Sequence, residues 1–180
     1  MNPFKNYYKR IVKQDFINKF KTNRNKKLPK LKKITLNFGC KSFPLPKFAT
    51  TMLALEIITK KKPSITKSKK PNILLKIQKG QPVGGKVELK KNSAYTFINN
   101  LNLTILAQFK NFSGVKMKNH TLFCQLPKNT IKLQELEAQY PLFSELPILD
   151  INISTNVKNT NELMFFAKSM KLSKNKNNKY

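Results

Sequence analysis

The sequence predicts a compact α+β domain with a mixed, largely antiparallel sheet. Segments whose apolar residues alternate with polar ones, as in half-buried strands, are interspersed with segments whose apolar residues recur at three- and four-residue steps, as in amphipathic helices. Hairpin-like signals between strands favour antiparallel pairing. The length of 180 residues is usual for one domain, and such a chain can bury roughly 70% of its unfolded surface.

The first predicted element is an amphipathic helix from Pro3 to Phe20. A transit peptide is the alternative, but it would favour Arg and Ser over this Lys-rich stretch, which contains Asp15. Residues 21–30 then predict a polar, basic linker, and Ile34 to Phe38 alternates as in a half-buried strand that Gly39 closes. The apolar residues that recur at helical steps in the first element are Tyr7, Tyr8, Ile11, Val12, Phe16 and Phe20.

A loop and a second helix follow. Pro44 and Pro46 predict the loop, after which apolar residues repeat with helical period from Phe48 to Ile58. The helix is expected to stop before Pro63 and to carry three lysines, residues 60–62, in its last turn, where positive charge is favourable.

The rest of the chain predicts shorter elements. Strands are expected at residues 64–66, 73–78, 86–89, 121–126 and 148–156, and helices at residues 93–106 and 163–170. A basic loop at 67–72 and a Gly/Pro turn before residue 86 separate the first three strands, and Asn159 to Glu162 has the pattern of a helix start. Residues 173–180 are almost entirely Lys, Asn and Ser and predict a basic, disordered tail, or one ordered only against RNA.

The charge of the chain predicts a polyanionic partner. The sequence has 36 Lys and Arg against 8 Asp and Glu, a formal net charge of +28, which makes an isolated domain repel itself. Five of the eight acids lie in the last third, so the basic face is expected mainly before about residue 120. Only Arg10 and Arg24 are arginine, so phosphates would be bound by lysine point charges.

No catalytic, metal or cofactor site is predicted. Cys40 and Cys124 have no spacing typical of a disulfide framework or metal cluster. His120 has no acid nearby in sequence to orient it as a base, and Glu135 and Glu137 are typical of a solvated loop. No apolar run is long enough to span a bilayer, so no membrane partner is expected.

The densest functional signal is the segment from Lys60 to Lys70. Its lysines are interrupted by hydroxyl residues and by Pro63, a composition that suits contacts to phosphates and 2′-hydroxyls of RNA. A run of charge is commonly only a solvated face, but the net charge of this chain favours RNA binding. Phe109, Phe112 and Phe123 can stack on bases, although core packing is the commoner role of Phe.

A phosphate-binding P-loop is an alternative interpretation of Gly80 to Lys86. The spacing matches as far as the lysine, but Val87 stands where Ser or Thr must bind magnesium, and the following residues alternate like a strand. An enzyme that used this segment would bind nucleotide with magnesium and lose that binding in Lys86→Ala.

Several runs of residues together follow the pattern of one known family. Leu28 to Gly39, Phe109 to Gly114 and Asp150 to Ile153 resemble segments of the ribosomal protein L-five family. The most specific likeness is an ordered series in the middle of the chain: Lys62, Pro63, Thr66, Lys67, Lys69, Lys70, Lys76, Gly80, Pro82, Gly84, Lys86 and Val87. The resemblance covers roughly residues 7 to 172 and is weak from 116 to 149. The chain departs from the family pattern at Lys60-Lys61, at Ile73-Leu74, where the family has small residues, and at Lys79, where it has an acid.

The resemblance implies a mostly antiparallel sheet of five or a similar number of strands, with helices packed on one face. It implies one domain over residues 1–172, with an N-terminal part at about 7–60 and a C-terminal part at about 61–172. The implied function is that of a structural, non-enzymatic constituent of the large ribosomal subunit. Its partners would be 5S rRNA or its replacement, large-subunit rRNA, the elbow of the P-site tRNA, and neighbouring proteins of the central protuberance and the small-subunit head.

The expected RNA-binding residues are Asn37, Lys62, Thr66, Lys67, Lys69, Lys70, Lys76, Lys79 and Lys86, and the expected tRNA-proximal loop contains Lys67, Ser68, Lys69, Lys70 and Asn72.

The abundance of Lys, Asn, Ile and Phe is typical of AT-rich genomes, and the resemblance begins near Tyr7, which leaves no room for a cleaved presequence. We therefore expect a mitochondrial ribosome, with a plastid as the alternative. A free, sequence-tolerant RNA-binding protein or RNA chaperone is the alternative function.

Overall fold

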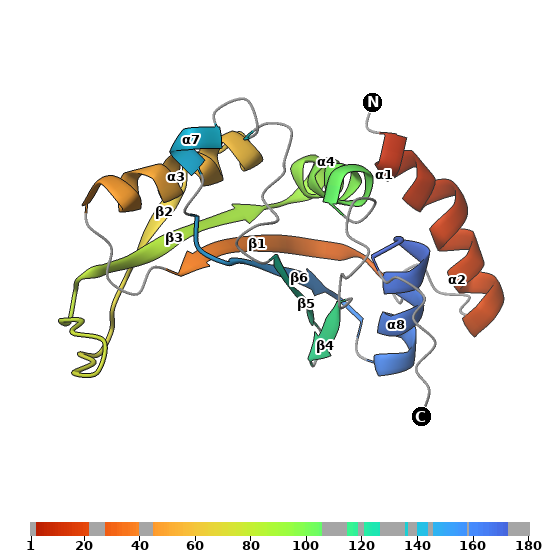
Figure 1. The fold of residues 1–180 in the computed structure, drawn as a ribbon. Helices are drawn as coiled ribbons and strands as arrows, with labels where there is room; N and C mark the ends of the chain where they lie inside the picture. Colours follow the sequence, from red (N-terminus) through yellow and green to blue (C-terminus); the bar gives the residue numbers. More distant parts are fainter. Residues whose placement is uncertain are drawn as a thin grey trace, which may run out of the picture. The chain divides into compact units, whose positions relative to one another are not determined.

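The computed structural model of the chain confirms the α+β class (Figure 1). It describes residues 3–21, 28–39, 45–105, 115–118, 121–126, 136, 140–143, 146–157 and 159–172. Over these residues, six strands form one largely antiparallel sheet in the order β2-β3-β1-β6-β5-β4. The strands are β1 (Leu31–Gly39), β2 (Ser64–Lys67), β3 (Pro82–Leu89), β4 (Lys116–Lys118), β5 (Thr121–Leu126) and β6 (Leu149–Thr155).

The chain divides into two compact units. Unit 1 comprises residues 1–34, 90–124 and 152–180, and unit 2 comprises residues 35–89 and 125–151. Every residue predicted to bind RNA lies in unit 2. The domain boundaries expected from the sequence stay a prediction.

A helical segment without a break opens unit 1, as predicted. It consists of α1 (Pro3–Tyr7), a π-helical stretch (Tyr8–Val12) and α2 (Lys13–Phe20). Its buried side chains are Phe4, Tyr8, Val12 and Phe16. Ile11 was predicted on the same apolar face, but it is 47% exposed, whereas the neighbouring Val12 in the same π-helical stretch is fully buried.

The end of the predicted polar linker is buried instead of solvated. Leu28 and Pro29 are both buried, and each carbonyl oxygen accepts a hydrogen bond. Tyr8 Oη donates to Pro29 O at 2.5 Å, and Asn156 Nδ2 donates to Leu28 O at 2.8 Å. These bonds satisfy the backbone as it enters β1, so its burial is not penalised.

Two more helical segments belong to unit 1. α4 (Lys91–Asn100) continues into a π-helical stretch (Leu101–Ile105), and α8 spans Thr160–Ser169. Both predicted helices are confirmed over the described residues, with starts two and three residues earlier than the sequence indicated. At the start of α8, Asn159 Nδ2 donates a hydrogen bond to Glu162 Oε1 at 2.8 Å.

In unit 2, α3 (Leu45–Thr59) packs on β3, and the short helix α7 (Tyr140–Phe143) lies against α3 (Figure 1). Pro46 was predicted in a loop but stands in the first turn of α3, where the N–H that proline lacks has no helical partner to lose. The lysines at 60–62 follow the helix and do not form its last turn. Lys60 has a φ of 53°, and its N–H donates to Glu56 O at 2.7 Å.

The predicted strand at residues 73–78 is wrong. Residues 73–76 form a turn, and only an isolated bridge joins Asn72 to Ile77. The next strand, β3, begins at Pro82, four residues before the predicted start at residue 86, so Gly84 and Gly85 belong to the strand and not to a Gly/Pro turn. The strands expected at 121–126 and 148–156 are confirmed as β5 and β6.

Some predicted features lie outside the described residues: Arg24, Cys40, Phe109, Phe112, His120, Glu135, Glu137 and the tail at 173–180. Where the chain is described, it contains no helix long and apolar enough to cross a membrane.

Candidate nucleic-acid interface

The two faces of the β2–β3 hairpin differ in what covers them. The strands pair with Ser64 opposite Lys86, Ile65 opposite Gly85 and Thr66 opposite Gly84, and directly opposed residues point to the same face. Gly85 lies under α3, since a Cβ added to it would lie 2.5 Å from Met52 Sδ. Ser64, Thr66 and Lys86 therefore project from the face opposite α3, which we call the open face.

Glycine at position 84 lets β3 approach its neighbours closely on the open face. A Cβ added there would collide with the Phe38 carbonyl oxygen of β1 and would lie 3.1 Å from Thr66 Oγ1. A side chain at this position would have to push two strands apart. Because residue 84 is glycine, the Thr66 hydroxyl, one of the predicted RNA-binding groups, can lie directly over β3 on the open face.

β1 contributes further polar groups to the open face. Leu36 and Phe38 are buried, whereas Thr35 and Asn37 are half-buried, and side chains alternate between the two faces along a strand. Because β1 is the sheet neighbour of β3, its buried residues share the α3 side with Val87 and Leu89. Asn37 therefore lies on the open face together with Thr66 and Lys86.

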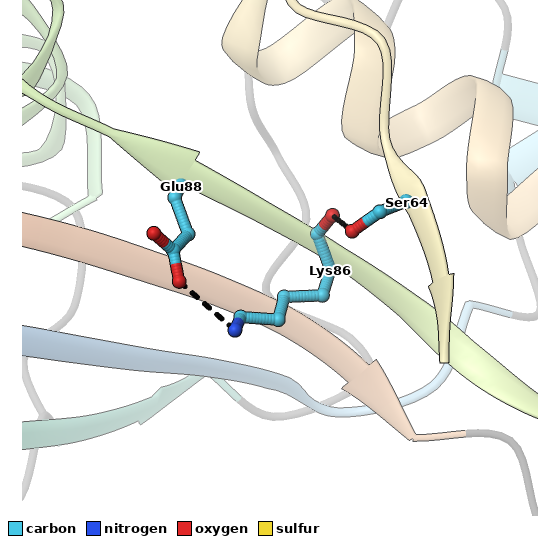
Figure 2. Close-up of polar contacts among 3 residues, drawn as sticks. All are labelled: Ser64, Lys86 and Glu88. Atoms are coloured by element: carbon cyan, nitrogen blue, oxygen red, sulfur yellow. Dashed lines mark hydrogen bonds and ion pairs between the residues drawn. The ribbon is translucent and has the colours of Figure 1, made fainter. Parts of the chain in front are cut away.

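Charge on the open face of unit 2 is nearly balanced. Lys86 Nζ lies 2.9 Å from Glu88 Oε1, with the two side chains 39% and 30% exposed, and Ser64 Oγ donates to Lys86 O at 2.9 Å (Figure 2). Asp150 of β6 accepts a hydrogen bond of 2.9 Å from Gln125 Nε2 of β5. This face offers hydroxyl and amide groups more than net positive charge.

Positive charge without an acid beside it is found on the loop that joins β2 to β3, residues 68–81, which extends past the end of β1 (Figure 1). We call Lys69, Lys70, Lys76 and Lys79, together with Lys67 at the end of β2 where the loop starts, the loop lysines, and all five are exposed. No acid occurs in the sequence between Glu56 and Glu88, and among the described residues no ion pair neutralises a loop lysine. Five positive charges on one protruding loop are suited to bind phosphates.

Backbone hydrogen bonds give this loop a defined hairpin shape. Ser68 N donates to Gln81 O and Gly80 N donates to Ser68 O, each at 2.9 Å, which continues the ladder past β2. Nearer the tip, Asn72 and Ile77 exchange two bonds of 2.9 and 3.0 Å. Gly80 has a φ of 85°, a conformation that glycine adopts without strain. The loop lysines are thus displayed from an ordered backbone.

The P-loop interpretation fails on the conformation of its residues. A phosphate-binding loop needs a turn whose N–H groups surround the phosphate and which leads into a helix. Here Gly84 and Gly85 are buried within β3, and Lys86 is paired with Glu88 in the same strand. The segment cannot surround a phosphate without the strand being broken.

Neither Cys124 nor the acidic residues of the described part of the chain form a candidate thiol nucleophile or metal centre. Cys124 is 2% exposed, and burial raises the pKa of its thiol to about 12, so it is not a thiolate at neutral pH. No group of three or more His, Cys, Asp or Glu that could hold a metal occurs in the described part of the chain. Phe123 is half-buried in β5.

The structure brings the predicted RNA-binding residues into two groups and leaves Lys62 apart from both. Asn37, Thr66 and Lys86 lie on the open face, whereas Lys62 is exposed just before β2 and the others belong to the loop lysines. Ser68 and Asn72 lie in the loop with their side chains engaged: Ser68 Oγ donates to Lys70 O at 2.6 Å, and Asn72 Oδ1 accepts from Leu75 N at 3.3 Å.

Sequence reasoning missed two features of this region. It did not anticipate that Glu88 pairs with Lys86, although the alternation of a strand places residues 86 and 88 on one face. It also assigned Ile73 and Leu74 to a strand, whereas both side chains are almost fully exposed at the tip of the loop.

Comparisons with known proteins give a consistent result. The chain is 31% identical over 181 residues to "Large ribosomal subunit protein uL5m" of Reclinomonas americana, which covers 98% of this chain and 100% of that protein. It is 32% identical to "Large ribosomal subunit protein uL5" of Wigglesworthia glossinidia brevipalpis, over 87% of this chain and 89% of that protein. It is also 31% identical to uL5m of Schizosaccharomyces pombe, over 81% of this chain and 53% of that protein. No family model matches the chain.

Proposed function

Because this chain belongs to the uL5 family of large ribosomal subunit proteins, the family that its sequence resembles, we propose that it binds 5S rRNA or an equivalent rRNA segment in the central protuberance. We further propose that its β2–β3 loop approaches the elbow of the P-site tRNA. At the coarser level, membership of this family makes the chain a structural constituent of the large ribosomal subunit. Its location is the mitochondrial ribosome, as the two uL5m relatives indicate.

The observation that carries the proposal is the separation of charge from hydrogen-bonding groups. The loop lysines supply phosphate contacts, which dominate affinity for RNA and do not depend on its sequence. The open face supplies the Thr66 hydroxyl and the Asn37 amide, which can bond 2′-hydroxyls and base edges and fix the register of the complex. A folded RNA that contacts both the open face and the loop would use both groups.

Lys86 has a smaller part in this proposal than the sequence suggested. Its charge is largely offset by Glu88, so it contributes less to phosphate binding than an unpaired lysine. Lys62 and the loop lysines have no such partner among the described residues, and we assign the main electrostatic contacts to them.

The approach to tRNA rests on the protrusion and order of the loop. Its tip lies beyond the end of β1 and is held by paired backbone hydrogen bonds, so it can reach an RNA that the sheet does not touch. Lys69, Lys70 and Lys76 would bind the phosphates of that RNA.

Sedimentation tests the ribosomal assignment. Mitochondrial extract is separated on sucrose gradients at moderate and at high salt, and the protein is detected by antibody. We expect it to sediment with the large subunit under both conditions. Detection in light fractions only would instead indicate a free RNA-binding protein.

Binding of the purified chain tests the residues. We expect tight binding to 5S rRNA, or to the large-subunit rRNA segment in its place, and much weaker binding to random RNA of equal length. Lys69→Ala with Lys70→Ala should weaken specific binding at least tenfold, since fewer counterions are released when fewer lysines bind phosphates. Lys168→Ala on α8, an exposed lysine in the acid-richer last third, is the control and should change affinity less than twofold. Equal effects of the loop and control variants would refute the assignment of the loop.

A further inference from the structure

The tip of the β2–β3 loop exposes two large apolar side chains. Ile73 is 93% and Leu74 is 94% exposed, whereas the next most exposed large apolar side chain in the described residues, Leu103, is 67% exposed. Burial of such a side chain would stabilise the folded chain, and that contribution is absent here. A single exposed leucine is unremarkable, but two adjacent ones at a protruding tip are typical of a contact surface.

The tip holds these side chains outward through its own hydrogen bonds. Lys76 N donates to Ile73 O at 3.1 Å, and Leu75 N donates to Asn72 Oδ1 at 3.3 Å. Lys76 has a φ of 52°, which reverses the chain within the turn. Ile73 and Leu74 therefore occupy the outer corner of a closed turn, so a partner could bind them without reordering the backbone.

The surroundings of the tip restrict what its partner can be. The loop lysines surround the apolar pair, and no acid lies in the sequence from residue 57 to residue 87, so an anionic partner is favoured over a neutral protein surface. Two side chains bury too little apolar area to anchor a protein stably in a membrane. Even a single myristoyl chain binds a membrane only marginally, and stable anchoring takes two such signals. The face of one unpaired RNA base, by contrast, has an area that an aliphatic pair can cover. In DNA, Leu and Ile wedges of minor-groove proteins pack against base faces in a comparable way.

We propose that Ile73 and Leu74 pack on the face of an unpaired or end-stacked nucleobase in the RNA whose phosphates the loop lysines bind. This inference rests on the proposed function and adds to it a contact that recognises bases. Lysines alone would bind any phosphate backbone. The apolar pair can contribute binding free energy only where a base face has no stacking neighbour. Such faces occur in folded RNA and are absent from regular duplex, so the pair favours folded RNA.

Photo-crosslinking tests the position of the tip. A benzophenone amino acid replaces Leu74 in the full chain, which is bound to total mitochondrial rRNA and tRNA, irradiated and mapped by reverse transcription. Ile65, which is 53% exposed on the α3 side of β2, carries the same probe in the control. We expect crosslinks at one or two unpaired nucleotides from position 74 and none there from position 65. Equal crosslinking from both positions would overturn the inference, and so would preferential labelling of lipid when cardiolipin-containing vesicles are added.

Salt dependence separates the apolar contact from the charged ones. For the crosslinked RNA, Ile73→Ser with Leu74→Ser should lower affinity about tenfold, in the range of one base-stacking interaction, and should leave the salt slope unchanged. Lys69→Ala with Lys70→Ala should instead reduce the slope of log K against log salt by about 1.5. Ile65→Ser is the matched control for removal of an exposed apolar side chain and should leave affinity unchanged.

The two levels of the proposal fail in different ways. Suppose that the Ile73/Leu74 variant binds as tightly as the natural chain, while the Lys69/Lys70 variant shows both the lower affinity and the smaller salt slope. The base contact is then refuted, and the proposed function stands. If the natural chain shows no preference for its rRNA or tRNA over random RNA, the proposed function fails and the inference fails with it.

Discussion

Lysine residues of this chain differ in the charge that they present to a partner. Lys86 lies 2.9 Å from Glu88, and the strand holds both side chains on one face, so part of its charge is neutralised within the protein. Lys69 and Lys70 are exposed on a loop without acids. The sequence motif does not distinguish these lysines, whereas the structure pairs Lys86 with an acid and leaves Lys69 and Lys70 exposed.

At the same scale, burial of Cys124 predicts a loss of stability at alkaline pH. Burial raises the pKa of this thiol from 9.0 to about 12, so the folded chain keeps a proton that the unfolded chain loses. The contribution of the protonated thiol to the free energy of unfolding is fully present below pH 9. It falls as pH rises from 9 toward 12, by at most about 1.4 kcal/mol per pH unit. Urea unfolding of the natural chain and of Cys124→Ala between pH 7.5 and 10 measures the difference.

The Cys124→Ala variant has no thiol to ionise. The loss in free energy of unfolding that this substitution causes, relative to the natural chain, should therefore be largest at pH 7.5 and smaller at pH 10. Tyr95, whose pKa burial also raises to about 12, is present in both proteins, so its ionisation cancels in the comparison. A cost independent of pH would mean that the thiol ionises alike in both states.

At the scale of elements, the β2–β3 hairpin depends on two adjacent glycines with different surroundings. A Cβ at position 84 would meet the backbone oxygen of Phe38, whereas a Cβ at position 85 would meet Met52 Sδ at 2.5 Å and Leu55 Cδ1 at 2.9 Å. Backbone in a paired strand cannot move without loss of sheet hydrogen bonds, but the end of a methionine side chain can change rotamer.

Gly84→Ala should therefore destabilise unit 2 by about 1–3 kcal/mol, and Gly85→Ala by less, since removing glycine from a strand interior recovers about 0.5–1 kcal/mol. Urea unfolding followed by circular dichroism measures both. Gly84→Ala should also weaken RNA binding, because moving β3 away from β1 displaces Thr66 from Asn37. A larger loss in free energy of unfolding for Gly85→Ala than for Gly84→Ala would show that Met52 and Leu55 of α3 adjust less readily to an added Cβ than the backbone of β1 does.

Sequence patterns predicted elements well where burial and alternation agree. β5 and β6 were placed within one residue at each end because every second side chain is buried. Residues 73–78 were mistaken for a strand because Ile73, Leu74, Leu75 and Ile77 are apolar, and composition cannot tell whether such a run is covered by a helix or left at a turn. The reversal depends on hydrogen bonds of Asn72 and on the positive φ of Lys76, which are properties of the folded backbone.

At the scale of the whole molecule, charge and motif order predicted the partner class and the family without any knowledge of the fold. The basic residues and the ordered series from Lys62 to Val87 pointed to ribosomal RNA, and the comparisons confirmed the family. The arrangement of polar groups on the open face could not be predicted, because it depends on hydrogen bonds such as that from Gln125 to Asp150, which strand pairing brings together.

The same net charge predicts that the free protein is stabilised by salt. A chain of 180 residues with a formal charge of +28 repels itself when compact, and the Debye length shortens from about 14 Å at 0.05 M salt to about 6 Å at 0.3 M. The melting temperature measured by calorimetry should therefore rise by several degrees over this range. Lys69→Glu with Lys70→Glu lowers the net charge by four, so this variant should melt higher at low salt and respond less to salt. A melting temperature that falls with salt in both proteins would show that ion pairs such as Lys86–Glu88, which salt weakens, outweigh repulsion among the excess lysines.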